Sequence, residues 1–508
     1  MSAGHPANSG TAVDINAAAA VHRNALYQPD ALVVRYAGGN LTCAQLDDRA
    51  ARLASVFAEG GVAAGDRVAY LGLNSPAFLT TMLAAFRLGA IFVPVNSRLA
   101  GPELRSVLQR SGASILVCEE GHRAVVKAVR EQTALKRLLL VDDDPEAPTT
   151  SLAHRRFDDP AVLMFTSGTT GRPKGVILTH GNIWWNCVNV DSRLDTRRGD
   201  VTHAAAPIFH VGALNSFVMR TLLRGGTVVL RRASEPQAFL DDLLTYRVNS
   251  FFAAPAMLTA VARVPGVFEA DLSHVRTIVV AGAPVPPSLI QQYAEHGLWL
   301  QQAWGLTETA PFATHLPVER TLDKLGSAGI PMPHTEVRVV DPATNEPVSP
   351  GTRGEVVVRG PNVTPGYWED PEVTRAAFDE EGWFHSGDIG YLDEDGYLFI
   401  VDRLKDMIIS GGENVYPAEI ENVLLGHPDI ADVAVIGRPS ERWGETPLAV
   451  VVRTGDTLTE QDVLQFTEGK LARFKRPTGA VFVDEIPRNP SGKALKRVLR
   501  EQFPDPAP

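Results

Sequence analysis

Residues 166–175 combine the groups that a phosphate-binding segment needs. The segment contains three glycines, four hydroxyl side chains and one lysine within ten residues. Glycines let backbone N–H groups approach an anion closely, hydroxyls add short donors, and Lys174 supplies a mobile positive charge. Apolar runs at 161–165 and 176–178 flank the segment and indicate buried strands. The segment is therefore a candidate site for the triphosphate of a nucleotide.

The segment departs from the usual phosphate loop, in which a Gly-Lys-Ser/Thr sequence opens a helix. Here Lys174 lies between Pro173 and Gly175, and the proline removes one N–H and disfavours a helix start. A flexible surface hairpin that binds nothing is the alternative interpretation. The candidate phosphate-binding residues are Thr166, Ser167, Gly168, Thr169, Thr170, Gly171 and Lys174.

The bulk properties of the chain narrow the function classes. With 508 residues it is too long for one core and should form two or more domains. A net charge of −11 argues against nonspecific nucleic-acid binding, which needs a basic face. The three cysteines lie far apart without metal-ligand spacing, and neither a signal peptide nor a membrane span stands out. We therefore expect a cytoplasmic protein.

Strand and helix patterns alternate along most of the chain. We expect a hairpin over 31–42, a helix over 43–59 and a strand–helix–strand unit over 68–95. Later strands end at small or turn-forming residues, so their loops should converge on one crevice. These later strands are 227–230, 250–252 and 277–280.

The texture of the sequence changes twice after these strands. Short alternating strands at 336–359 indicate a small β barrel or curled sheet, and the last hundred residues read as a compact α+β unit. The predicted fold is α/β. We expect a large N-terminal domain, residues 1–402, made of α/β subdomains and a small β-rich subdomain, and a smaller α+β C-terminal domain, residues 403–508.

Several further motifs follow the phosphate-binding segment in a fixed order. Together they resemble the signatures of the adenylate-forming enzymes: acyl- and aryl-CoA synthetases, adenylation domains of peptide synthetases, and luciferase. The resemblance covers nearly the whole chain and is strongest to bacterial fatty-acyl-CoA synthetases. The motifs are Gly282-Ala283-Pro284, Trp304-Gly305-Leu306-Thr307-Glu308, Gly387-Asp388, Asp402-Arg403-Leu404-Lys405-Asp406, Gly411-Gly412-Glu413-Asn414 and Asn489-Pro490-Ser491-Gly492-Lys493.

The resemblance implies an ATP site with Mg²⁺. Trp304 would offer a face for adenine, Glu308 with Thr166 would hold Mg²⁺ on the phosphates, and Asp388 would accept the ribose hydroxyls. Taken singly, these residues could equally be a core aromatic, a surface glutamate and a turn aspartate. The implied ATP and AMP ligands outside 166–175 are Gly282, Ala283, Pro284, Gln302, Ala303, Trp304, Gly305, Thr307, Asp388, Ile400, Arg403 and Lys493.

The resemblance also assigns roles to the C-terminal part. Lys493 would stabilise the charge that develops when a carboxylate attacks the α-phosphate of ATP. Lys405 would be the hinge about which a mobile C-terminal domain rotates. The implied catalytic residues are Lys493, Thr307, Glu308 and His210, and the implied CoA-binding residues are Gly411, Gly412, Trp443, Phe474 and Arg476.

The implied acyl pocket lies around His210, Val211, Gly212 and Gly329. The residues after His210 are small or apolar, and Arg220 is the nearby candidate partner for a second carboxylate, although it could equally face solvent. This favours a monocarboxylate with an apolar tail.

The expected activity is that of an ATP-dependent fatty-acid–CoA ligase, AMP-forming, acting on a medium- or long-chain acid through acyl-AMP. The alternatives are an aryl-CoA ligase of benzoate or cinnamate type, a ligase that loads a carrier protein, and a catalytically silent nucleotide-binding module. The expected partners are the acid, ATP and CoA, without nucleic acid. Peripheral membrane contact and the choice between monomer and homodimer stay open.

Overall fold

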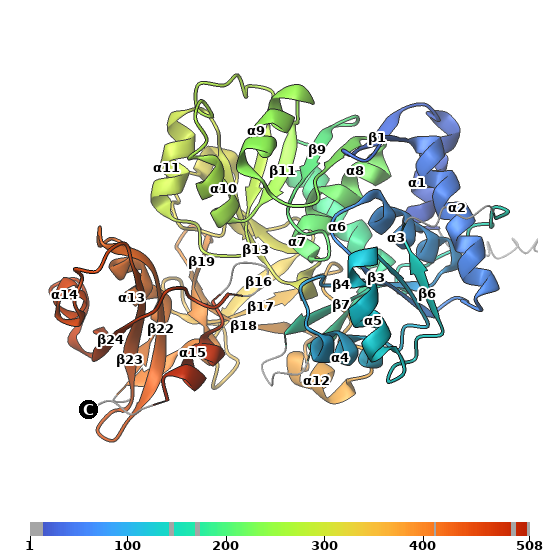
Figure 1. The fold of residues 1–508 in the computed structure, drawn as a ribbon. Coiled ribbons are helices and arrows are strands. Elements are labelled where there is room, and N and C mark those ends of the chain that lie inside the picture. The colour runs from blue at the N-terminus through green and yellow to red at the C-terminus, as the bar shows by residue number, and fades with distance from the viewer. Residues whose placement is uncertain (1–13, 142–146, 168–172, 411–412, 489–493, 505–508) are drawn as a thin grey trace, which may run out of the picture.

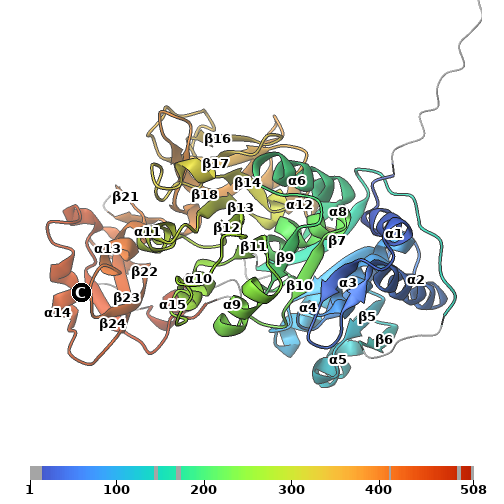
Figure 2. The same ribbon diagram turned by 90° about the horizontal axis from the view of Figure 1, so that it is seen from above.

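The computed structural model describes residues 14–141, 147–167, 173–410, 413–488 and 494–504 (Figures 1 and 2). The described residues form four β-sheets with helices packed around them. Strand–helix alternation dominates the first two sheets, and antiparallel strands dominate the last two. The α/β class expected from the sequence is confirmed.

A six-stranded sheet has the order β6-β5-β3-β4-β7-β8. Its strands are parallel except for the hairpin of β7 and β8. The strand–helix–strand unit predicted over 68–95 is confirmed, because β3 and β4 pair in parallel and are connected by helix α3, Pro76–Leu88. The strands are β3 Arg67–Leu71, β4 Ile91–Val95, β5 Ile115–Cys118, β6 Arg137–Leu140, β7 Pro160–Ser167 and β8 Pro173–Thr179.

A nine-stranded sheet has the order β15-β14-β13-β12-β11-β9-β10-β1-β2. Its six central strands, from β13 to β1 in that order, are parallel, so their carboxyl ends meet at one edge as expected. The strands are β1 Leu32–Arg35, β2 Leu41–Thr42, β9 Val201–Ala204, β10 Thr227–Leu230, β11 Ser250–Ala253, β12 Thr277–Val280, β13 Leu300–Gly305, β14 Phe312–His315 and β15 Ile330–Pro331.

The β-rich part after residue 335 is an antiparallel four-stranded sheet in the order β16-β17-β18-β19. Within the described residues no ladder joins β16 to β19, so the sheet is open and not a closed barrel. Its strands are β16 Glu336–Val340, β17 Gly354–Arg359, β18 Phe384–Leu392 and β19 Leu398–Arg403. From the sequence, residues 383–387, just before Asp388, are expected to be poor in strand. Strand β18 instead begins at Phe384 and includes Asp388, which corrects that expectation.

The remaining sheet follows after Arg403 and lies to one side of the others in Figure 1. The α+β character predicted for the last hundred residues is confirmed by a helix from Pro417 and by strands that include residues 433–436 and 448–452. Its strands are β20 Ile408–Ser410, β21 Glu413–Val415, β22 Ile430–Ser440, β23 Gly444–Arg453 and β24 Gly479–Phe482, and its helices are α13 Pro417–Leu424, α14 Glu460–Phe466 and α15 Lys496–Gln502.

Contacts join this last sheet to the four-stranded one. The backbone N–H of Ala418 donates to the Asp402 carboxylate at 2.8 Å. Arg353, just before β17, lies 4.8 Å from the ring centre of Tyr416 and 3.6 Å from the Glu419 carboxylate. The two parts are therefore held by polar contacts, which are weaker than an apolar core.

The other helices have recognisable start signals. Helix α2 Cys43–Glu59, predicted over the same residues, begins with a capping box formed by Thr42 and Gln45. Several others carry proline in the first turn, where its missing N–H costs nothing. Apart from α2, the α-helices of the described residues before Arg403 are α1 Ala17–Tyr27, α3 Pro76–Leu88, α4 Gly101–Ser111, α5 Arg123–Arg130, α6 His180–Arg193, α7 Val211–Ala213, α8 Met219–Arg224, α9 Pro236–Thr245, α10 Pro255–Val261, α11 Pro287–Glu295 and α12 Pro371–Ala377.

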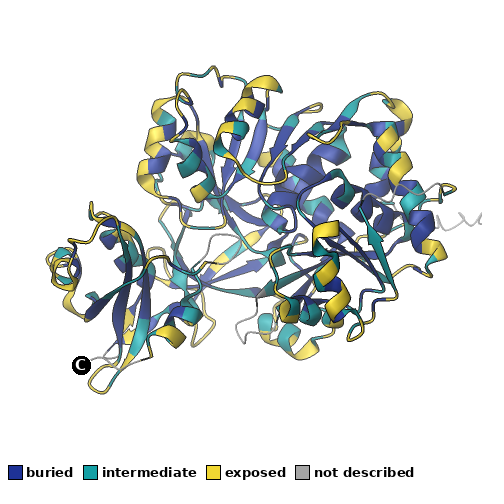
Figure 3. Ribbon diagram, in the orientation of Figure 1, coloured by how far each residue is buried: buried dark blue, intermediate teal, exposed yellow. Residues whose placement is uncertain are grey.

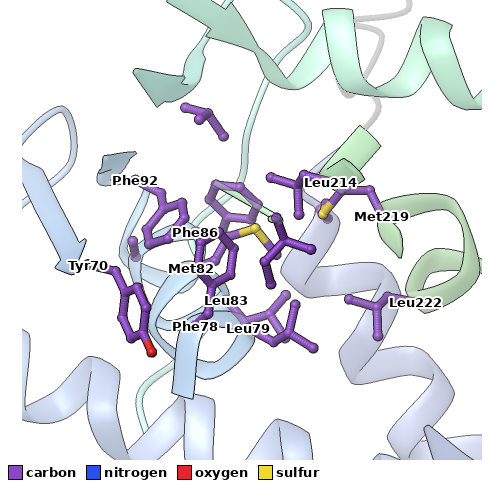
Figure 4. Close-up of a cluster of buried hydrophobic side chains, with 14 of the residues drawn as sticks. Tyr70, Phe78, Leu79, Met82, Leu83, Phe86, Phe92, Leu214, Met219 and Leu222 are labelled. Atoms are coloured by element: carbon purple, nitrogen blue, oxygen red, sulfur yellow. The ribbon is translucent and has the colours of Figure 1, made fainter. Parts of the chain in front are cut away.

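The largest apolar core lies around α3, which contacts strands and helices of both large sheets. Figure 4 shows Phe86 and Met82 of α3 beside Leu214 and Met219. Burial is highest along the strands, and the outer helix faces are exposed (Figure 3). No helix in the described ranges is long and apolar enough to cross a membrane.

A buried ion cluster fixes the segment after the predicted acyl-pocket residues. This segment contains a π-helical turn, Leu214–Val218, followed by α8. Arg220, 3% exposed, contacts Asp191 at 2.6 Å and Asp200 at 3.4 Å. Arg224 and Arg276 contact the same two carboxylates. Arg220 therefore does not face solvent, and its charge is already neutralised.

Replacing Arg220 by methionine should destabilise the protein, because it removes a cation from between two carboxylates. We expect a loss of about 3 kcal/mol, the lower end of the range for breaking a buried pair, since two arginines remain at the cluster. Urea denaturation and the melting temperature measure this loss. Arg197→Met, which removes an exposed pair with Asp195, is the control and should leave the melting temperature near wild type. Equal melting temperatures for the two variants would contradict this assignment.

Candidate active site

The described parts of the candidate phosphate-binding segment lie at the ends of strands β7 and β8, which we call the phosphate hairpin. Strands β7 and β8 pair antiparallel, with Thr166 opposite Lys174 and Ser167 opposite Pro173. This agrees with the absence of a helix start at Lys174 and places the backbone of Thr166 and Lys174 side by side. The predicted ligands Gly168, Thr169, Thr170 and Gly171 lie outside the described residues.

Trp304 and Asp388 join the nine-stranded sheet to the four-stranded sheet. The indole Nε1 of Trp304, at the end of β13, donates to Asp388 Oδ2 at 2.9 Å. Arg403 Nε forms an ion pair with the other oxygen, Oδ1, at 3.3 Å, and Asp388 and Arg403 are opposite each other in β18 and β19. Asp388 is 6% exposed, so the Trp304 hydrogen bond and the Arg403 charge together support a buried carboxylate.

Trp304 itself is largely a core residue. It is 8% exposed and packs with apolar side chains of the four-stranded sheet, and the predicted nucleotide residue Ile400 borders the same cluster. Most of the indole surface is thus covered by protein. Trp304 therefore holds the Asp388 carboxylate by a hydrogen bond, and little of its ring is exposed as a face for adenine.

Glu308 lies in a 3-10 turn, Thr307–Thr309, directly after β13. Its Oε1 accepts a hydrogen bond from the Tyr367 hydroxyl at 2.9 Å. Burial raises the pKa of the Glu308 carboxyl, and the Tyr367 hydroxyl and the charges of Arg403 and Lys174 act in the opposite direction. The residue keeps intermediate exposure, so its carboxylate is enclosed by protein yet reachable.

These residues fit a Mg²⁺ ion that is shared with a nucleotide. No group of three or more His, Cys, Asp and Glu side chains in the described ranges could form an all-protein metal site. Mg²⁺ at nucleotide sites instead takes one or two carboxylates and completes its shell with phosphate oxygens and water. A single partly buried carboxylate, whose pKa is raised by burial and whose charge a cation would offset, matches that arrangement. Glu308 is the candidate ligand, with Thr166 on β7 as the second.

Two of the predicted site glycines are required by close backbone approach. A Cβ atom on Gly305 would lie 1.8 Å from the carbonyl oxygen of Pro311. Gly329 has a φ of +90°, and a Cβ atom there would lie 2.0 Å from the carbonyl carbon of His315. Close backbone packing therefore explains why both positions are glycine, independently of any ligand.

The remaining predicted nucleotide residues lie on the strand ends. Gln302 and Ala303 belong to β13, and Gly282, Ala283 and Pro284 follow β12. The side-chain Nε2 of Gln302 is buried without a hydrogen-bond partner in the described structure. A buried amide donor without a partner is a candidate contact for a substrate oxygen.

On the acyl side, His210 precedes α7, which contains Val211 and Gly212. Burial and the charge of Arg98 lower the pKa of His210 to about 4, so the ring is neutral at physiological pH. Its Nε2 is buried, with no partner among the described residues. A Cβ atom on Gly212 would lie 3.0 Å from the Phe252 ring, so Phe252 borders this side.

Within the described residues, the predicted CoA-binding residues of the C-terminal part make no contact with this cluster. Trp443 and Phe474 are 46% and 40% exposed, and Arg476 pairs with Glu468 at 2.9 Å. Lys405 is an exposed residue of the short turn after Arg403. Gly411, Gly412 and Lys493 lie outside the described residues.

The structure adds Tyr367, which the sequence did not point to. Its hydroxyl contacts Glu308, and its ring centre lies 5.2 Å from Lys174 Nζ. Tyr367 is 59 residues away from Glu308 in the chain. A Gly-Tyr-Trp sequence at 366–368 carries no periodic signal, so only the fold reveals the contact.

Comparison with known families agrees with this geometry. The AMP-binding enzyme family matches residues 21–368, and the AMP-binding enzyme C-terminal domain matches residues 419–493. The chain belongs to the AMP-binding enzyme family, and the adenylate-forming resemblance is confirmed.

Among curated relatives, a feruloyl-CoA synthase from Amycolatopsis sp is 46% identical, covering 95% of this chain and 98% of the relative. An indoleacetate–CoA ligase from Aromatoleum aromaticum is 41% identical, with 95% and 97% covered. The long-chain-fatty-acid–CoA ligase FadD13 of Mycobacterium tuberculosis is 40% identical, with 91% and 93% covered. These relatives support a CoA ligase activity of the AMP-forming type for this chain.

Among solved structures, ATP-bound MatB from Rhodopseudomonas palustris has a TM-score of 0.90 at 32% identity, covering 97% of this chain and 99% of MatB. The apo form of MatB, with the same coverage, has a TM-score of 0.77. This chain is therefore more similar overall to the ATP-bound structure than to the apo structure.

Asp388→Asn should weaken AMP binding about tenfold or more, because it removes the buried charge that Trp304 and Arg403 hold in place. Isothermal titration calorimetry with AMP measures the change. Asp395→Asn is the matched control, since Asp395 lies in the turn between β18 and β19 with its side chain 64% exposed. Unchanged AMP affinity in Asp388→Asn would remove Asp388 from the nucleotide site.

Proposed function

We propose that this protein is an AMP-forming CoA ligase for aryl acids of the hydroxycinnamate or arylacetate kind. The observation that carries the proposal is the buried Asp388 carboxylate held by Trp304 and Arg403, with Glu308 and Lys174 close to the same strand ends. The identities to feruloyl-CoA synthase and to indoleacetate–CoA ligase support an aromatic acid.

A monocarboxylate suits the acyl side of the site. Arg220 is committed to Asp191 and Asp200, so it does not offer a charge to a second carboxylate. Phe252 borders Gly212 and packs against an apolar cluster. This cluster includes Phe217 of the π-helical turn, Val279 and Phe312. An aromatic ring gains from burial against such side chains.

The fatty-acid substrate, the first expectation from the sequence, stays as the second candidate. The identity to FadD13 supports it, because that relative is named for long-chain fatty acids. CoA is the proposed acceptor, with a carrier protein as the alternative.

In the first half-reaction a carboxylate oxygen of the acid forms a bond to the α-phosphorus of ATP, and the bond from that phosphorus to pyrophosphate breaks. Asp388 would hold the ribose, and Lys174 and the phosphate hairpin would orient the triphosphate. Mg²⁺, when bound by Glu308 and Thr166, would supply positive charge to the phosphate oxygens. Lys493 would offset the charge shared by the carboxylate and the α-phosphate.

In the second half-reaction the CoA sulfur attacks the acyl carbonyl and AMP leaves. We propose that residues 403–508 form the unit that moves between the two steps, with Lys405 at the hinge. Polar contacts at Arg353 and Asp402 suit a contact that must break and re-form. Trp443, Phe474 and Arg476 are proposed to contact CoA together with Gly411 and Gly412.

The substrate class can be tested by measuring AMP and CoA-thioester formation with ferulate, cinnamate, benzoate, indoleacetate and saturated acids from short to long. We expect the highest kcat/KM with an acid that carries an aromatic ring. Highest kcat/KM with a long saturated acid would make the fatty-acid alternative correct. AMP formation that requires a carrier protein in place of CoA would change the acceptor.

Lys493→Ala tests the division of the two half-reactions. Acyl-AMP formation should fall by about a hundredfold or more, because a transition-state charge contact is lost. Transfer from supplied acyl-AMP to CoA should stay near wild type. Lys470→Ala in the same part of the chain is the control. Equal loss of both half-reactions in Lys493→Ala would contradict the proposed roles.

A further inference from the structure

Tyr367 connects the carboxylate and the lysine of the candidate phosphate site. Its hydroxyl donates to Glu308 Oε1 at 2.9 Å, and Lys174 Nζ lies 5.2 Å from the centre of its ring. A lysine within about 6 Å of an aromatic face is attracted by the ring. Tyr367 is 8% exposed, so both contacts occur largely away from solvent.

The backbone around Tyr367 is fixed to the phosphate hairpin. The residues from 366 to 368 lie beside β8: Ile177 N donates to Gly366 O at 3.1 Å, and Trp368 N donates to Gly175 O at 2.7 Å. A β-bridge pairs Tyr367 with Val176. The position of the tyrosine is therefore set by the same strand that carries Lys174.

The same segment is also fixed to the turn of Glu308. Thr364 N donates to the backbone oxygen of Glu308 at 2.7 Å. On the other side, Tyr367 N donates to Thr374 Oγ1 of α12 at 2.9 Å. Gly366 allows this approach, because with a φ of +144° a Cβ atom there would lie 2.4 Å from Thr374 Cγ2. Three elements thus hold one side chain between Glu308 and Lys174.

This arrangement restricts how the two charged side chains can move. The hydroxyl occupies one oxygen of Glu308, which leaves the second oxygen for a cation. The ring attracts Lys174 to a preferred position, and the N–H donors of the lysine ammonium remain able to bind an anion. Without these contacts, both flexible side chains would have to be ordered when the nucleotide binds.

We propose that Tyr367 is a positioning residue for acyl-AMP formation: its hydroxyl fixes the Glu308 carboxylate and its ring fixes Lys174, so that both groups face the phosphates of MgATP. The inference rests on the proposed function, because acyl-AMP formation is the reaction that Tyr367 would assist. The ATP-binding test of the inference needs no carboxylic acid.

Two variants separate the contacts. Tyr367→Phe removes the hydroxyl and keeps the ring under Lys174, and Tyr367→Leu removes both. Tyr293→Phe is the matched control, since the Tyr293 hydroxyl is also buried and donates to Leu258 O at 2.8 Å, on α11 and without a contact to Glu308 or Lys174 in the described structure. A loss of stability from deleting one buried hydroxyl should be similar in Tyr367→Phe and Tyr293→Phe.

Calorimetry with ATP in Mg²⁺ and with ATP in EDTA is the first readout. Tyr367→Phe should weaken binding of MgATP about ten- to a hundredfold, the value of a hydrogen bond to a charged group, and leave binding of metal-free ATP unchanged. Tyr367→Leu should weaken both, because Lys174 is also released. Tyr293→Phe should change neither.

The half-reactions are the second readout. In Tyr367→Phe, acyl-AMP formation should fall while transfer from supplied acyl-AMP to CoA stays within about twofold of wild type, which a purely structural defect would not do. Wild-type binding of MgATP by Tyr367→Phe, or equal loss of both half-reactions, would overturn the proposal. If the wild-type protein activates no acid but Tyr367→Phe still weakens MgATP binding, the proposed function is wrong and the positioning role is supported.

Discussion

The arrangement of the site depends on the hydrogen bond between Trp304 and the buried carboxylate of Asp388. Asp388 lies on β18 of the four-stranded sheet, and Trp304 at the end of β13 in the nine-stranded sheet donates to it at 2.9 Å. Arg403, the last residue of β19, balances its charge. A buried carboxylate without these partners would be costly, so the two sheets are held where both partners reach it. The contact therefore joins β13 and β18, two strands that carry predicted nucleotide residues.

A second constraint is the compensation of charge at Glu308. Burial disfavours its ionised form, and a hydroxyl and two cations favour it. These groups come from distant segments: Tyr367 from the connection between β17 and α12, Lys174 from the phosphate hairpin and Arg403 from β19. A divalent cation with phosphates would complete the same balance. The site therefore suits a ligand that combines a divalent cation with phosphate anions.

Much of the fold could be predicted from the sequence, because local signals coincide with the elements. The helix over 43–59 has apolar spacing and a capping box, and the phosphate hairpin has proline where a helix would start. Asp388 could not be placed in a strand, because β18 is polar there. His385 pairs with Glu355 and Ser386 with the Val356 carbonyl, so these polar side chains are satisfied by neighbours that the sequence does not reveal. The ion partners of Arg220 and the contact of Tyr367 with Glu308 could not be predicted for the same reason: the partners are distant in the chain.

The central claim is that one nucleotide site activates a carboxylic acid by adenylation. Exchange of labelled pyrophosphate into ATP, measured with ferulate and without CoA, tests it most directly, because only reversible acyl-AMP formation produces the exchange. The account predicts exchange that requires the acid, ATP and Mg²⁺ and does not require CoA. ATP binding without exchange for any aromatic or aliphatic acid would contradict it and leave a nucleotide-binding module in its place.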